Sequence, residues 1–408
     1  MDSKYIKELD EKLTIDGSES VLIQDNDGTK QLNINTLINT VNNNIDLTSY
    51  ATKSYVDESV NNIDLTSYAT KSYVDSVINN QNQSADVPDI VKLNKENEPL
   101  ILNASRGRIS KYNDATPLTF VHFSDIHKHQ DLWNRIMDYI NYYHYYIEFG
   151  IHTGDYCLEN LDTYIDLYAN GTKCVKPIFN CLGNHDIYNS DGTMNKQGAY
   201  NKIFNHRSDW NVKFITGVSV SYPLSYYKDF DASKIRLIVL NSYFDIDAQC
   251  TWLTARLNEA KSLGYHVITC CHEKTNALTN KLNTTFNTID NKFEGKTTYK
   301  FDAVIGNWIK SGGIHVANLC GHEHTDYIGY TTNGVLNICI EAGTNNMFWI
   351  DGKRVEGTKT YDCFNVVSVE QGTGILKIVR IGNNYNHYLM DKTLLCYDYI
   401  NKRIISSR

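Results

Sequence analysis

Apolar, strand-like runs recur between residues 118 and 324, and each one ends in side chains that can bind a metal ion. β-branched and aromatic residues dominate these runs, as is typical of buried strands. In chain order the polar ends are Asp125 and His127, Gly154-Asp155, Gly183-Asn-His-Asp186, His272, and Gly321-His-Glu-His324. Because loops at the carboxyl ends of strands converge, we expect these groups to meet at one edge of a single sheet.

The segments between the runs favour an α/β fold. Helix-like sequence follows the first run at Leu132–Tyr146, and a further helix is expected at Cys250–Leu263, before the apolar run His266–Cys271. A short helix is also expected near Tyr164–Tyr168. Strand, polar turn and helix therefore alternate along the chain, which is the order of βαβ units.

The side chains at the strand ends indicate which metal ions could bind there. Carboxylate, amide and imidazole groups together favour Mn, Fe or Zn over calcium or sodium. A lone histidine is more often a hydrogen-bonded core or surface residue, but so many motifs at strand ends rarely coincide. The donors are too many for one tetrahedral ion and suit two ions about 3.5–4 Å apart that share a carboxylate. The candidate ligands are Asp125, His127, Asp155, Asn184, His272, His322 and His324.

These motifs resemble the five sequence blocks of the calcineurin-like metallophosphoesterases, and the resemblance covers about residues 117–385. It implies a β-sandwich flanked by helices, which the runs Phe364–Val369 and Gly374–Arg380 would complete as a closing hairpin. It also implies an enzyme that hydrolyses phosphoric ester bonds with two divalent metal ions as cofactors. Manganese is the expected metal, and iron or zinc would also suit these ligands.

The resemblance assigns a role to each motif residue. Asp125, His127 and His324 would hold one metal, while Asn184, His272 and His322 would hold the other and Asp155 would bridge them. His185 would be the catalytic acid, oriented by Asp186. Many family members carry a charged residue at a fixed position after Gly-Asp. Glu159 is near that position, and its role stays open.

The N-terminal part of the chain carries an internal repeat. The segment Ile45–Asp57 recurs word for word as Ile63–Asp75, with asparagines at the joints. Its thin apolar stripe cannot be buried by one chain, so several copies of the chain would bury it together. The repeat, with a predicted hairpin at residues 21–34 before it, resembles the N-terminal part of bacteriophage tail and head fibres. That resemblance implies a slender, trimeric stalk; a polar linker duplicated by accident is the alternative.

Four domains are therefore expected. Residues 1–40 would form a virion-attachment-like hairpin segment, residues 41–82 a helical repeat stalk that trimerises, and residues 83–116 a linker or collar. Residues 117–408 would form the metallophosphoesterase domain with its C-terminal strands. The insertions 187–232 and 273–312 lie beside the predicted site and would shape its pocket.

Composition excludes several classes of protein. The net charge of -8 argues against a surface that wraps nucleic acid. The charged N-terminus has no signal-peptide core and no apolar run reaches a membrane-spanning length, so we expect synthesis in a host cytoplasm. The 10 cysteines form no zinc motif, and those in apolar runs are expected to be buried free thiols.

Together these features predict a phage virion protein, in a tail or fibre, that presents a phosphoesterase. Its N-terminus would contact other virion proteins, and its substrate would be a phosphorylated polymer of the host surface. One alternative is a non-catalytic structural or receptor-binding virion protein whose metal site stabilises the fold. Another is a cytosolic nucleotide phosphoesterase with an unusual N-terminal extension.

Overall fold

The computed structural model describes residues 20–25, 28–33, 87–98, 100–101, 117–157, 170–189, 191–204, 211–281, 298–343, 354–383 and 393–407. By its contacts the chain divides into two compact units, Met1–Gln83 and Ser84–Arg408. The sequence repeat, the helix expected near Tyr164–Tyr168, and Glu159 lie outside the described residues.

In the first unit the structure describes one antiparallel pair of strands, β1 (Ser20–Asp25) and β2 (Gly28–Asn33). The pairing runs from Ser20 opposite Asn33 to Asp25 opposite Gly28. An Asp/Asn/Gly-rich connection favours a tight turn between two short strands. The hairpin predicted for residues 21–34 is confirmed.

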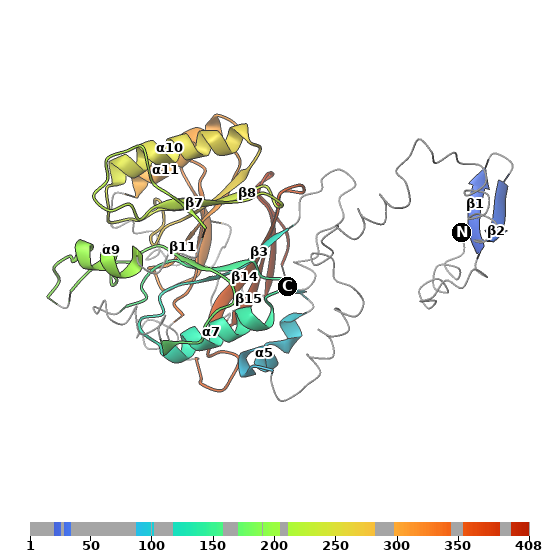
Figure 1. The fold of residues 1–408 in the computed structure, drawn as a ribbon, viewed down its shortest axis with the longest axis horizontal. Coiled ribbons are helices and arrows are strands. Elements are labelled where there is room, and N and C mark those ends of the chain that lie inside the picture. Colours follow the sequence, from blue (N-terminus) through green and yellow to red (C-terminus); the bar gives the residue numbers. More distant parts are fainter. Residues whose placement is uncertain are drawn as a thin grey trace, which may run out of the picture. The chain divides into compact units, whose positions relative to one another are not determined.

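The second unit contains two mixed sheets (Figure 1). The seven-stranded sheet has the order β17-β16-β15-β14-β3-β4-β5, in which β3, β4 and β5 are parallel and the other pairs antiparallel. Its strands are β3 (Leu118–Phe123), β4 (Phe149–His152), β5 (Ile178–Asn180), β14 (Cys363–Glu370), β15 (Ile375–Gly382), β16 (Leu394–Asp398) and β17 (Arg403–Ser407). The predicted closing hairpin is the β14–β15 pair.

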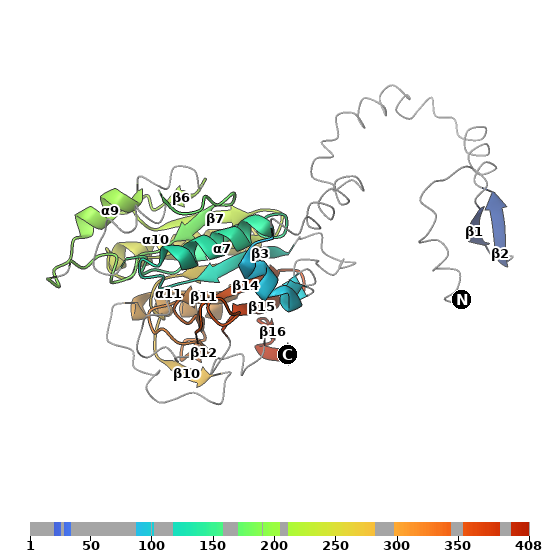
Figure 2. The same cartoon turned by 90° about the horizontal axis from the view of Figure 1, so that it is seen from below.

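The eight-stranded sheet has the order β10-β12-β13-β11-β9-β8-β7-β6, so that β10 and β6 lie at its two edges (Figure 2). Strands β8, β9, β11 and β13 run parallel at its centre. Its strands are β6 (Lys213–Phe214), β7 (Tyr226–Phe230), β8 (Ile235–Val239), β9 (His266–Cys270), β10 (Leu278–Lys281), β11 (His315–Cys320), β12 (Tyr327–Thr331) and β13 (Leu336–Cys339).

The two sheets share one apolar core. Phe120 and Phe149 from the seven-stranded sheet belong to the same buried cluster as Leu237, Ile268 and Leu319 from the eight-stranded sheet. The rings of Phe120 and Phe149 stack with centroids 4.7 Å apart. Side chains of two facing sheets that fill one core define a β-sandwich.

Helices cover the outer faces of the sandwich (Figure 1). Helix α7 (Gln130–Tyr142) packs on the seven-stranded sheet, with Trp133 and Ile136 in a cluster with Val121. Helices α10 (Ile246–Ser262) and α11 (Tyr299–Lys310) pack on the other sheet. The short elements α5 (Asp89–Leu93), η3 (Lys95–Asn97) and α9 (Lys196–Phe204) complete the described helices. This is a mixed α/β architecture consistent with a metallophosphoesterase fold.

The expectation of one sheet was wrong. The polar ends at Asp125, Asp155 and Asn184 follow strands of the seven-stranded sheet, whereas His272 and His322 follow strands of the eight-stranded sheet. Every one of these strands is fully buried along its length. The apolar pattern of such a strand therefore does not indicate which of the two sheets it joins.

Part of the segment expected to be a linker packs on the large unit. Ile90, Val91 and Ile101 are buried in the same cluster as Trp133 of α7. The large unit therefore begins before residue 117, the start expected from composition. All ten cysteines are free, and Cys181, Cys270, Cys271, Cys320 and Cys339 are buried as predicted. Among the described helices, none is long and apolar enough to cross a membrane.

Candidate metal centre

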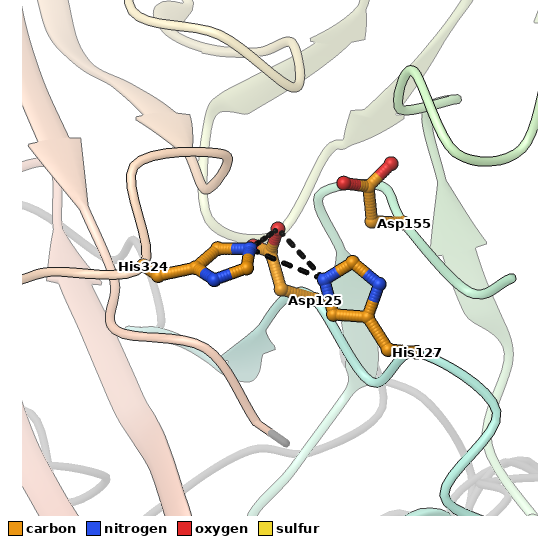
Figure 3. A group of neighbouring side chains, drawn as sticks. All are labelled: Asp125, His127, Asp155 and His324. Carbon is orange, nitrogen blue, oxygen red and sulfur yellow. Dashed lines mark hydrogen bonds and ion pairs between the residues drawn. The ribbon is translucent and has the colours of Figure 1, made fainter. Parts of the chain in front are cut away.

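The predicted ligands gather into two groups that share one carboxylate. Asp125, His127, Asp155 and His324 form the first group, in which the candidate ligand atoms all lie within 4.8 Å of one another (Figure 3). Asp155 also belongs to the second group, with His272 and His322. One carboxylate common to two clusters is the arrangement that a pair of neighbouring cations requires.

Loops from both sheets supply these residues. Asp125 and His127 follow β3, Asp155 follows β4, and the histidines of the second group follow β9 and β11. The loop after β3 is tied to the loop after β4, because the amides of Asp125 and His127 donate to the carbonyls of Gly154 and Asp155, both at 3.0 Å. The amide of Gly321 donates to the carbonyl of His272 at 2.9 Å and ties together the two loops of the other sheet.

The backbone of the site is strained. Asp125, His127, Asp155, His322 and His324 all have positive φ, between 45° and 69°. A non-glycine residue in this left-handed region costs about 1–3 kcal/mol and persists only where surrounding contacts enforce it. Half of the ten non-glycine residues with positive φ in the described part of the chain are therefore candidate ligands. Such concentration is typical of functional sites.

Backbone carbonyls orient the histidines of both groups. Nδ1 of His127 lies 3.2 Å from the carbonyl of Cys157, and Nδ1 of His272 lies 2.7 Å from the carbonyl of Thr153. A carbonyl only accepts, so each Nδ1 carries a hydrogen and each Nε2 faces the cluster. A ligating histidine typically donates its other ring N–H to such a group.

In the second group three polar atoms surround Nε2 of His272. Nε2 of His272 is 3.2 Å from Oδ2 of Asp155, 3.2 Å from Oδ1 of Asn184 and 3.2 Å from Nδ1 of His322. One proton on His272 satisfies only one of these neighbours, whereas a cation among them would satisfy Nε2 and all three neighbours. Asn184 therefore joins the group as the sequence predicts.

In the first group, too, the polar atoms lie closer together than the available protons can satisfy. Nε2 of His324 lies 3.1 Å from Nε2 of His127 and 3.1 Å from Oδ1 of Asp125 (Figure 3). That oxygen of Asp125 is buried and is also 3.8 Å from Nε2 of His127. Buried acceptors that converge in this way fit a divalent cation. The residues present therefore fit the two-metal centre that the sequence predicts.

The two carboxylates of the centre each lie beside a histidine, Asp155 beside His272 and Asp125 beside His324. Burial by itself raises the pKa of Asp155, but His272 opposes it and holds that pKa well below the ordinary value. Burial likewise lowers the pKa of His272, yet the carboxylate of Asp155 outweighs it and raises that pKa to about 10. The pKa of Asp125 is also well below its ordinary value, because His324 overcomes the effect of burial. Both carboxylates are therefore ionised at neutral pH.

Asp186 holds the backbone of the site rather than the ring of His185. Its carboxylate accepts from the amides of Asp155, Gly183 and Cys157, each at 2.9 Å. Burial and the charge of Asp155 raise the pKa of Asp186 to about 7. Both residues lie in the described part of the chain, and no hydrogen bond joins the Asp186 carboxylate to the His185 ring there.

His185 lies beside the first group. Its backbone amide donates to Oδ1 of Asp155 at 2.9 Å, and its ring centroid is 5.1 Å from that of His127. The residue is half-buried, whereas Asp125, His127 and Asp155 are buried.

Two residues that the motifs did not identify also contact the second group. The hydroxyl of Tyr243 donates to Oε1 of Glu273 at 2.5 Å and lies 3.5 Å from Oδ1 of Asn184. Glu273 directly follows the ligand His272 in sequence, which is a signal that could have identified it. Tyr243 follows β8, which carries no motif, and only the parallel pairing of β8 with β9 brings it to the site.

The chain belongs to the calcineurin-like phosphoesterases, whose family model matches residues 118–326. These enzymes bind a dinuclear metal centre, and the matched segment contains all seven candidate ligands.

Several solved structures resemble the chain, among them a phosphatase and a nucleotidase. A dimetal phosphatase from Danio rerio has 11% identity and a TM-score of 0.40, over 65% of this chain and 96% of that one. The NAD nucleotidase of Haemophilus influenzae has 12% identity and a TM-score of 0.36, over 72% of this chain and 54% of that one. Similarity at this level says nothing about the substrate. No curated protein matches the chain.

Proposed function

We propose that this chain hydrolyses phosphoric esters with two divalent cations bridged by Asp155. The observation that carries the proposal is the pair of ligand groups that meet at that carboxylate. Asp125, His127 and His324 would hold one cation, while Asn184, His272 and His322 would hold the other. When bound, the two cations would supply an activated water and neutralise the charge of the phosphate.

The residues around the two groups have separate roles in this proposal. His185 holds a proton near the leaving oxygen and donates it as the ester bond breaks. Asp186 fixes the loop that carries Asp155, because it accepts the backbone amides of Asp155 and Cys157 in that loop. The strained loop backbone keeps the ligands in place before substrate binds, which is the preorganisation that electrostatic catalysis needs.

The N-terminal repeat supports a more specific setting for this activity. We propose that the repeat forms a trimeric stalk of a phage tail or fibre and that the enzyme cleaves a phosphorylated polymer of the host surface. The support is the exact recurrence of Ile45–Asp57 as Ile63–Asp75 and its resemblance to phage fibre segments. Light scattering of the full chain should give the mass of a trimer, and a monomer would contradict the stalk.

Hydrolysis of bis-p-nitrophenyl phosphate and p-nitrophenyl phosphate with added Mn²⁺ tests the enzymatic proposal. Turnover should depend on the metal, stop with a chelator and be lost in Asp155→Ala. The two substrates also distinguish diester from monoester activity. Purified host envelope polymers, assayed for released phosphate or fragments, then test the natural substrate.

A chain that binds two ions but hydrolyses neither ester with Mn²⁺, Fe²⁺ or Zn²⁺ would contradict the proposal. That result would favour a metal-stabilised structural or receptor-binding protein.

A further inference from the structure

The candidate ligand His322 is oriented differently from His127 and His272. His127 and His272 are each fixed by a backbone carbonyl. The ring of His322 instead has Nδ1 on the side of the second group, 3.2 Å from Nε2 of His272. Its other nitrogen, Nε2, is 3.9 Å from Oε1 of Glu273. A side-chain carboxylate therefore stands where the other two ligands have a carbonyl.

Burial and a hydrogen bond hold Glu273 in this position. It is only 3% exposed, and a buried carboxylate is costly unless polar groups surround it. The hydroxyl of Tyr243 donates to its Oε1 at 2.5 Å, and the same oxygen faces His322. The 3.9 Å distance is longer than a hydrogen bond, and a movement of about 1 Å would close it to one.

Tyr243 contacts the second group on another side as well. Its hydroxyl lies 3.5 Å from Oδ1 of Asn184, so Tyr243 and Glu273 together touch two candidate ligands of the same cation. Both residues follow neighbouring parallel strands, β8 and β9, whose ends are adjacent in the sheet. The first group, on the other side of Asp155, has no part in these contacts.

We propose that Glu273, held by Tyr243, is a positioning residue that presents Nδ1 of His322 to the second cation. The inference rests on the proposed two-metal function and names residues outside its ligand set. A carboxylate that accepts the outer N–H of a ligating histidine fixes its tautomer and increases its basicity. Loss of such a partner typically lowers metal affinity about 10–100-fold.

Titration of the metal-free full chain with Mn²⁺, followed by calorimetry and by the electron paramagnetic resonance of coupled Mn²⁺ pairs, tests this role. Wild type should bind two ions. Glu273→Gln should keep the first affinity, weaken the second about 10–100-fold and lose the coupled signal at limiting Mn²⁺. Tyr243→Phe keeps the carboxylate and should weaken the same ion by a smaller factor.

A matched control and a double mutant separate positioning from a general loss of structure. Glu370→Gln makes the same change at a buried carboxylate, 6% exposed, at the end of β14 away from the site, and should leave both affinities unchanged. In a His322→Ala background, Glu273→Gln should cause no further loss, because the ring that it positions is gone.

Unchanged binding of both ions by Glu273→Gln overturns the inference, and so does a full additional loss in the His322→Ala background. If Glu273→Gln does not fold, Tyr243→Phe provides the test. An unchanged affinity of Tyr243→Phe for the second ion then overturns the inference. Turnover is not the readout. A wild type that binds two ions without hydrolysing any ester therefore refutes the proposed function and leaves this inference standing, whereas one that binds fewer than two refutes both.

Discussion

At the scale of single residues, the centre depends most on Asp155. Its two oxygens have different neighbours: Oδ2 faces His272, and Oδ1 accepts the amide of His185. Its backbone is also strained and is held by Asp186. No other candidate ligand belongs to both groups.

Asp155→Ala should therefore abolish binding at both metal positions, whereas the loss of any other single ligand should weaken mainly one. Metal content after dialysis, measured by mass spectrometry, checks this, with His324→Ala as the comparison that retains the second ion. Two ions bound by Asp155→Ala would contradict the bridging role.

His185→Ala should keep both ions and lose turnover. The ring of His185 is absent from both ligand groups, so its removal takes away a proton donor and not a ligand. General acid catalysis contributes about 10²–10⁴-fold, and kcat should fall by that factor. Metal content and kcat measured on the same sample give the answer, and wild-type turnover in the metal-loaded variant would refute the role.

At the scale of elements, the loops after the strands are packed so closely that only glycine fits at certain positions. A Cβ atom on Gly183 would collide with the carboxylate of Asp155, and one on Gly321 would collide with Ser124 and with the carboxylate of Asp125. These glycines precede Asn184 and His322 in the motifs. Their role is to let loops from different strands approach the ligands.

Gly183→Ala should displace Asp155 and lower metal affinity at both positions. Gly150→Ala is the matched control, because its added Cβ meets the ends of Ile178 and Ile140 and the ring of Phe123 in the core. The control should lose stability in thermal unfolding but keep its metal affinity. Equal metal affinity in the two variants would show that the close approach at Gly183 does not place Asp155.

Part of the arrangement of the elements could be predicted from the sequence. The apolar runs located β3, β4, β5, β9 and β11, and the polar residues after them are those that gather at the site. The division into two sheets could not be read from the runs, because fully buried strands lack an alternating pattern.

Two features of the site depend on contacts between distant loops. Asp186 was expected to orient His185, but its carboxylate accepts amides from the loop after β4, which adjacency in sequence did not indicate. Tyr243 reaches the site only through the pairing of β8 with β9.

At the scale of the whole molecule, several buried histidines link stability to pH. His315 at the start of β11 has its pKa lowered to about 3 by burial, and burial lowers that of His266 to about 4. Nε2 of His315 is 3.0 Å from the hydroxyl of Thr269, while its buried Nδ1 has no hydrogen-bond partner. The folded chain thus keeps these rings neutral where the unfolded chain would protonate them.

These two histidines should therefore make the metal-free protein less stable as the pH is lowered from about 6.5 toward 4, because the unfolded state binds more protons at them in that range. The raised pKa of Asp186 acts in the opposite direction. Each such histidine adds a slope of about 1.4 kcal/mol per pH unit. In urea unfolding at several pH values, His315→Gln should show a shallower decline than wild type. Parallel profiles would mean that His315 does not contribute.

The proposed function requires two neighbouring cations at Asp155. Anomalous scattering from crystals of the full chain grown with Mn²⁺ tests this most directly. We predict two peaks about 3.5–4 Å apart, one beside Asp125, His127 and His324 and the other beside Asn184, His272 and His322. A single peak, or peaks that do not share Asp155 as a ligand, would contradict it.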